Sequence, residues 1–198
     1  MKSVLISIKP KWCELIASGK KTIEVRKTRP KCDMPFKCYV YCTKDKDISF
    51  WTGKRYAYAD DRSHNLFDVC GNGKVIGEFV CKNMTCIQAD IDFQGEKHLY
   101  NTAFIENRMC LNDEELFNYI YDGKRNEGWG WHISDLVIYD KPKELSEFYK
   151  SGILSYDEWL YGIYNGKGGA TSSYESYKNV FKLKRLPQSW CYVEEVEP

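Results

Sequence analysis

A short segment near the N-terminus carries the side chains best suited to chemistry. Within GKKTIEVR, Lys21, Thr22, Glu24 and Arg26 provide an amine, a hydroxyl, a carboxylate and a guanidinium. In an extended strand, Thr22, Glu24 and Arg26 share one face because side chains alternate between the two faces. Such a face can bind an anion or a base edge. A lysine beside it that loses its proton can also serve as a base or nucleophile.

Four further residues are candidates for the same kind of site. Lys9 follows the first apolar run, SVLISI, and adds a cation. Glu78 stands among branched apolar residues in KVIGEFVCK, so it is either paired in a salt bridge or has a raised pKa. Trp131 and His132 lie in the aromatic stretch EGWGWHISDLVIY. They can line a cavity wall, or His132 can be an ordinary structural histidine.

Charge is distributed unevenly along the chain. The formal net charge is +1, yet residues 1–38 hold ten Lys and Arg against three acidic residues, a local charge of +7. Lys and Arg dominate contacts with polyanions, so this region suits a phosphate-bearing ligand. A basic surface that only maintains solubility is the alternative.

The elements that must position these residues follow from the hydrophobic pattern. Period-two runs predict strands, and apolar spacings of three and four with capping residues predict helices. We expect strands over 3–8, 22–26, 36–43, 74–82, 127–139 and 189–196. We expect helices over 10–19, 112–123, 142–148 and 155–164. The mixture predicts an α+β fold.

The 198 residues predict a single domain spanning 1–198. Residues 44–73 lack periodicity and are expected to form an insertion or lid. Its aromatic residues, such as Trp51 and Tyr56, could stack on a base, or they could cover a small hydrophobic core. The Gly- and Ser-rich residues 165–177 predict a flexible loop that lacks phosphate-loop spacing.

The cysteine count and the absence of long apolar runs indicate the compartment. Nine cysteines without a secretory leader predict reduced thiols, and their spacing does not indicate a zinc site. No apolar run reaches the length of a membrane helix. We therefore expect a cytoplasmic protein without a membrane segment, metal or cofactor.

The pattern G-x-K-x-x-E-x-R, formed by Gly19, Lys21, Glu24 and Arg26, resembles the ASCH domain family, which is related to the PUA and EVE domains. The resemblance covers the first 45 residues and touches GKVIGEFVC, WHISDLVIYDKPKEL and the last expected strand. It implies a small PUA-like β-barrel with flanking helices, here with long insertions. It also implies a groove that binds single-stranded RNA or a modified nucleobase or nucleoside.

One branch of that family is similar to an amidohydrolase that removes the acyl group from N4-acetylcytidine with a lysine, a threonine and a glutamate. Lys21 matches the lysine and Glu78 the glutamate, but this chain has Glu24 where that branch carries threonine. An enzyme here would therefore use Lys21 with Glu24 or Glu78. Binding is the favoured hypothesis, hydrolysis of an acylated cytidine or related nucleoside is the alternative, and a protein-interaction module is the third.

Overall fold

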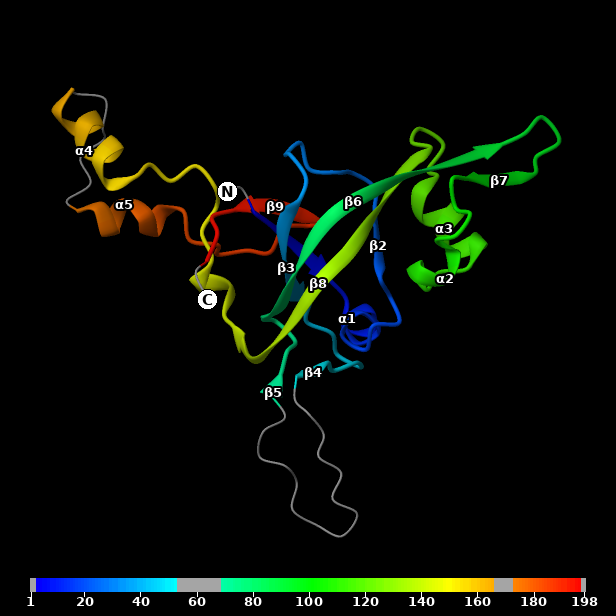
Figure 1. Cartoon of the computed structure of the whole chain (residues 1–198), viewed down its shortest axis with the longest axis horizontal. Coiled ribbons are helices and arrows are strands. Elements are labelled where there is room, and N and C mark those ends of the chain that lie inside the picture. The colour runs from blue at the N-terminus through cyan, green and yellow to red at the C-terminus, as the bar shows by residue number, and fades with distance from the viewer. Residues whose placement is uncertain (1–2, 53–68, 166–172, 197–198) are drawn as a thin grey trace, which may run out of the picture.

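The computed structural model describes residues 3–52, 69–165 and 173–196. One mixed sheet forms the centre of the molecule (Figure 1). Its strands are β1 (Ser3–Ile8), β2 (Ile23–Arg26), β3 (Phe36–Cys42), β6 (Val75–Ile91), β7 (Lys97–Tyr100), β8 (Glu127–Lys143) and β9 (Trp190–Val193). They are ordered β2-β8-β6-β3-β1-β9, and β7 pairs with β6 beside this path. β1 and β3 run parallel, and the other pairs are antiparallel.

The first helix along the chain lies near the middle of the molecule, and the other helices lie toward its two ends (Figure 1). They are α1 (Pro10–Ala17), α2 (Glu106–Met109), α3 (Asp113–Ile120), α4 (Tyr156–Tyr164) and α5 (Tyr174–Val180). Asn112 and Ser155 form the N-terminal capping boxes of α3 and α4 that the sequence predicts. The α+β class is therefore confirmed. No helix within the described ranges is both long and apolar enough to cross a membrane.

The expected closed barrel is wrong, because the described strands form an open sheet. The strand path ends at β2 on one side and at β9 on the other, and β2 pairs with β8 alone. β2 has four residues, and Arg26 reaches β1 through its side chain, whose Nη2 donates to the carbonyl oxygen of Ser7. A side-chain contact thus stands in the gap where a barrel would need backbone pairing.

The two longest strands, β6 and β8, depart from regular pairing. Each spans 17 residues, and their register shifts between Val75 and Gly77, between Glu78 and Val80, and between Cys81 and Met84. Such bulges bend a strand and increase its twist. They also interrupt the alternation of side chains between the two faces of the sheet.

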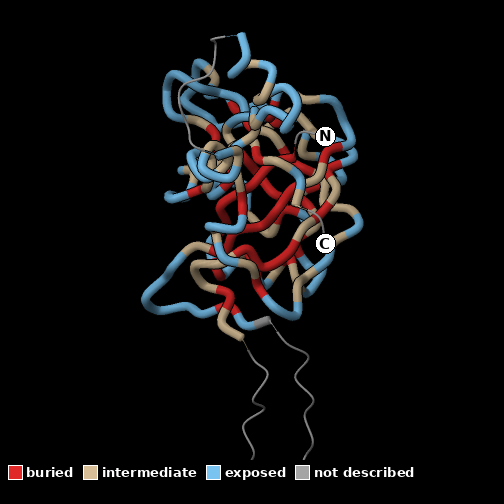
Figure 2. The backbone as a smooth tube through the Cα atoms, turned by 90° about the vertical axis from the view of Figure 1, so that its left-hand side faces the viewer, coloured by how far each residue is buried: buried red, intermediate tan, exposed pale blue. Residues whose placement is uncertain are grey.

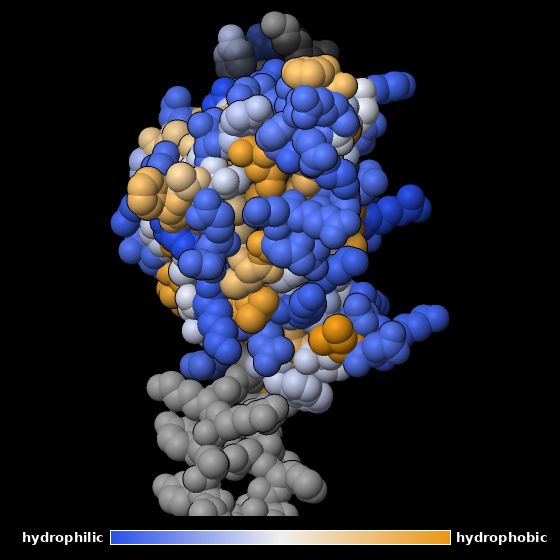
Figure 3. All heavy atoms as spheres, turned by 90° about the vertical axis from the view of Figure 1, so that its right-hand side faces the viewer, coloured by the Kyte–Doolittle hydropathy of each residue, from blue (hydrophilic) through white to orange (hydrophobic). Residues whose placement is uncertain are grey.

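Buried residues follow the sheet through the middle of the molecule (Figure 2). The cluster that bears on the site joins β2 and β6 to α2 and α3. It consists of Ile23, Val25, Ile87, Ala89, Ile105, Met109, Leu116, Phe117 and Ile120. Figure 3 shows the side of the molecule that carries α2, α3 and β7, where hydrophobic residues lie between hydrophilic ones. Packing of Ile23 and Val25 here confirms that one face of β2 enters a core.

Two expected segments differ in the structure. The helix expected over 142–148 is only a 3-10 turn at Leu145–Glu147, because β8 continues through Lys143. Part of the loop expected over 165–177 is helical, since α5 begins at Tyr174 and the Ser173 side chain caps it. Residues 166–172 lie outside the described residues.

The described ends of the 44–73 insertion form a small antiparallel pair, β4 (Trp51–Thr52) and β5 (Val69–Cys70). Asn72, just after β5, is hydrogen-bonded to the segment just before β4. Its side-chain oxygen accepts from Phe50 N, and its side-chain nitrogen donates to Ile48 O. The stacking residues expected between 53 and 68 lie outside the described residues.

Candidate functional site

A cavity of about 410 Å³ lies in the gap between β2 and β1. Its walls come from the end of β1 with Lys9, from Trp12 of α1, from Lys21 and β2, and from α3 with Tyr119. Ligand pockets commonly measure about 300–1,000 Å³. The place where the sheet stays open therefore holds a cavity large enough for a small organic ligand.

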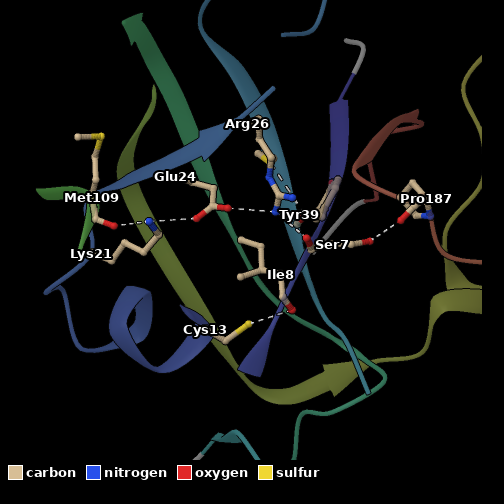
Figure 4. Close-up of polar contacts among 10 residues, drawn as sticks. Ser7, Ile8, Cys13, Lys21, Glu24, Arg26, Tyr39, Met109 and Pro187 are labelled. Carbon is tan, nitrogen blue, oxygen red and sulfur yellow. Dashed lines mark hydrogen bonds and ion pairs between the residues drawn. The ribbon is translucent and has the colours of Figure 1, made fainter. Parts of the chain in front are cut away.

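Three charged side chains form a row along the wall of this cavity, and we call Lys21, Glu24 and Arg26 the charged row (Figure 4). Lys21 Nζ lies 3.4 Å from Glu24 Oε2, and Arg26 Nη2 lies 3.1 Å from Glu24 Oε1. One carboxylate thus bridges two cations, and the row keeps one positive charge in excess.

The charged row is almost fully buried. The exposed fractions are 2% for Lys21, 6% for Glu24 and 9% for Arg26. Buried charges are tolerated where they are paired and hydrogen-bonded, because removal from water is costly for each ion. Mutual pairing explains how this row persists inside the protein, and it leaves the donors oriented without a ligand.

Lys21 is held by a segment from the far side of the sequence. Its Nζ donates to the carbonyl oxygen of Met109 at 2.5 Å, across 88 residues of sequence. The neighbouring Thr22 N donates to Arg108 O at 3.0 Å, and Arg108 Nε donates to Thr22 Oγ1 at 3.0 Å. Helix α2 therefore fixes the backbone and the side chain at the lysine end of the charged row.

Arg26 is held at the opposite end by β1. Its Nη2 donates to Ser7 O at 2.5 Å, and Ser7 Oγ donates to Pro187 O at 2.8 Å. Arg26 Nε is buried and has no hydrogen-bond partner among the described residues. Burial raises the pKa of the nearby Tyr119, and the guanidinium of Arg26 partly opposes that rise. Tyr119 is therefore a neutral phenol at physiological pH.

Aromatic side chains complete the cavity. Trp12 and Tyr119 both line it. Lys21 Nζ lies 5.1 Å from the centroid of the Trp12 ring, and Lys27 Nζ lies 5.5 Å from that of Tyr119. These distances are within the range of cation–π attraction. The cavity thus combines apolar ring surface with a charged wall.

The structure brings four of the predicted residues together. Lys9, Lys21, Glu24 and Arg26 line the same cavity. Thr22 lies next to Lys21, but its hydroxyl accepts from Arg108 and does not line the cavity.

The other three predicted residues lie outside the cavity. Glu78 accepts a hydrogen bond from Tyr139 Oη at 2.5 Å and forms an ion pair with Lys37 at 3.3 Å. Trp131 is fully buried in the main core, 5.7 Å from Phe36 between ring centroids.

His132 contacts Thr85 Oγ1 through Nε2 at 2.9 Å. Burial lowers its pKa, and the charge of Arg108 lowers it further. It is therefore a neutral imidazole in a hydrogen bond and does not line the cavity.

Sequence reasoning did not find several residues of the cavity. Trp12 and Tyr119 fall within the helices expected over 10–19 and 112–123, and Trp12 packs against the main core, but helical spacing does not indicate that either ring lines a cavity. Ser7 and Met109 contribute backbone carbonyls, which no residue type reveals. The position of Trp12 just after Lys9 and Pro10 was the only available signal for this wall.

In the parts of the chain that the structure describes, no three His, Cys, Asp or Glu side chains are grouped as metal ligands. No disulfide joins the nine cysteines, all of which lie in the described ranges, and burial raises the pKa of Cys13 and Cys38 well above the ordinary value. Such thiols behave as small core residues.

Comparison with known proteins supports the fold. No family model matches the chain, and no curated protein matches its sequence. A variant of the ASCH protein from Zymomonas mobilis, with serine replaced by alanine, has a TM-score of 0.51 at 12% identity, covering 98% of this chain and 89% of that chain. The ASCH protein from the same organism gives a TM-score of 0.44 at 15% identity, covering 72% and 73%. The match with a TM-score of 0.51 confirms the resemblance to ASCH domains as an ASCH-like fold.

Proposed function

We propose that the protein binds a nucleobase, carried by single-stranded RNA or by a modified nucleoside, in the cavity between β1, α1, β2 and α3. The observation that carries this proposal is the buried charged row on the wall of a ligand-sized cavity. A preformed set of donors with a fixed carboxylate can recognise the edge of a base.

The surroundings of the cavity support a nucleic acid or nucleoside ligand. Trp12 and Tyr119 provide aromatic surface against which a base can pack. Lys9 lies at the cavity and is exposed, and residues 1–38 carry the basic excess. An exposed cation beside a base pocket suits a ribose-linked phosphate.

Hydrolysis of an acylated nucleoside is the second candidate, and the contact between Lys21 Nζ and Glu24 inside the cavity favours it. Glu78 and Thr22 lie outside the cavity, so Lys21 and Glu24 would be the reacting groups. An ammonium held by two acceptors is a positioned donor, which suits binding more directly than nucleophilic attack.

Calorimetric titration of the full chain with modified nucleosides and short single-stranded RNAs tests the proposal. Lys21→Met should abolish binding, whereas Lys82→Met, at an exposed lysine paired with Asp135, should leave it unchanged. For RNA, affinity should fall with salt, and Lys9→Ala should lower the log-log salt slope by about 1. Native-state binding must also raise the melting temperature.

The same samples separate the alternatives. Release of acetate from N4-acetylcytidine, lost in Lys21→Met and in Glu24→Gln, would establish the hydrolase. If the intact protein binds neither nucleosides nor RNA and releases no acetate, the base-binding proposal is wrong, and a protein-interaction module becomes the leading hypothesis.

A further inference from the structure

The order of groups in the charged row defines a pattern of hydrogen bonding. Along the wall a donor, Lys21, is followed by an acceptor, Glu24, and then by a second donor, Arg26 (Figure 4). All three line the same cavity. A ligand edge that complements this order presents an acceptor, a donor and an acceptor.

The hydrogen-bond inventory shows which groups remain available. Lys21 Nζ donates to Met109 O and forms an ion pair with Glu24. Arg26 Nη2 donates to Ser7 O and forms the second ion pair with Glu24. An ammonium and a guanidinium together carry more N–H groups than these acceptors use, and the buried Arg26 Nε has no partner within the described ranges.

The carboxylate is also not saturated. Each oxygen of Glu24 contacts one cation, whereas an ionised carboxylate offers about four lone-pair sites. Glu24 can therefore accept one further N–H from a ligand without losing either ion pair. The site has spare donors at both ends and a spare acceptor in the middle.

We propose that the base bound here presents an imide edge, in which one N–H lies between two carbonyl groups, as in uracil and its derivatives. This inference rests on the proposed function and names its ligand class. The two carbonyl oxygens accept from Lys21 and Arg26, and the ring N–H donates to Glu24. The base plane packs against the aromatic surface of Trp12 and Tyr119.

Other bases leave part of this row unpaired. The pairing edge of cytosine places a ring acceptor where Glu24 requires a donor, so an acceptor would face a buried carboxylate. Adenine presents no carbonyl group to either cation. A mismatched base would cover the spare donors or the spare lone pairs of the row without pairing them, while the ion pairs within the row remain. Covering polar groups in this way is costly, and this cost is the basis of the discrimination.

Three ligands that differ at the central N–H test the inference on the unaltered full chain. Uridine, 3-methyluridine and cytidine are titrated by calorimetry, both as nucleosides and within short RNAs of otherwise identical sequence. Uridine should bind about ten-fold or more tightly than either of the others, because each alternative lacks the N–H that pairs with Glu24. Methylation at this nitrogen keeps both carbonyl groups and therefore isolates the acceptor Glu24.

A variant links the preference to the charged row. Glu24→Gln should reduce the preference for uridine over 3-methyluridine, whereas Glu127→Gln, at an exposed position on β8, should preserve it. Circular dichroism and the melting temperature establish that each variant is folded.

Each outcome decides a different claim. Cytidine or 3-methyluridine binding as tightly as uridine would overturn the imide preference, and base binding would stand. Absence of binding by all three, as nucleosides and within RNA, would overturn the proposed function and this inference together.

Discussion

Replacing Glu24 with glutamine removes the one negative charge that holds the charged row together. Glutamine keeps the size of the side chain and a carbonyl acceptor, so packing changes little. Lys21 and Arg26 would then remain buried, with exposed fractions of 2% and 9%, without a counter-charge between them. We therefore expect a large loss of stability from a change that removes no apolar contact.

The distances give the size of the effect. At 3.4 Å and 3.1 Å, and with an effective dielectric constant of about 20, each contact with Glu24 contributes about 5 kcal/mol of Coulombic attraction. The cost of removing three ions from water offsets much of this gain in the native protein. Measurements in which one partner of a buried pair is removed give about 3–5 kcal/mol, and we expect Glu24→Gln to lower the free energy of unfolding by that amount.

Urea unfolding at pH 7, followed by circular dichroism, measures the loss. The matched control is Asp135→Asn, which breaks the contact with Lys82 at 2.7 Å between side chains that are 60% and 56% exposed. That exposed pair should contribute only about 0–1 kcal/mol and should weaken with added salt, whereas the effect of Glu24→Gln should persist. If Glu24→Gln costs no more than Asp135→Asn, Glu24 does not hold Lys21 and Arg26 together as an electrostatic unit.

Two further predictions concern the long strands. Gly77→Ala should lower the free energy of unfolding, measured in urea, by about 1–3 kcal/mol, because the added Cβ would lie 2.3 Å from the carbonyl oxygen of Val137. The control is Gly162→Ala in α4, which should not destabilise the protein because the added Cβ meets nothing within 4 Å. NMR titration should give His132 a pKa below about 6.5, because burial and Arg108 disfavour its charged form. Below about pH 6.5 the imidazole of His132 binds a proton more readily in the unfolded chain than in the folded protein, so the free energy of unfolding should decrease as the pH is lowered. The His132→Gln variant should show a weaker dependence of stability on pH.

The parts of the fold that the sequence predicts are those with local causes. Strand β1 spans Ser3–Ile8 as the apolar run indicates, and α1 begins at Pro10, whose fixed φ suits a first helical turn. The capping boxes of α3 and α4 also lie where their spacing places them. Each signal acts within a few residues, so neighbouring sequence is sufficient to specify the element.

Side-chain direction on β6 could not be predicted in the same way. Strict alternation places Ile76 and Glu78 on one face, but Ile76 packs in the main core while Glu78 contacts Lys37 and Tyr139. The register shift in the pairing with β3 accounts for this. Val40 pairs with Gly77 and Tyr41 with Val75, so Ile76 is an extra residue in β6 that reverses the alternation. The bulge depends on pairing with β3, a separate segment of the chain, and therefore leaves no local signature.

The site itself combines both kinds of cause. The spacing of Lys21, Glu24 and Arg26 is local, and the sequence alone brings these residues to attention. The carbonyl of Met109, the ring of Tyr119 and the gap beside β1 come from distant segments, and they decide that the charged row faces a cavity. Had β2 paired with β1 through its backbone, the space between the two strands would have been closed. Because Arg26 spans that gap with its side chain, the same interaction that joins the two strands also places a cation on the wall of the cavity.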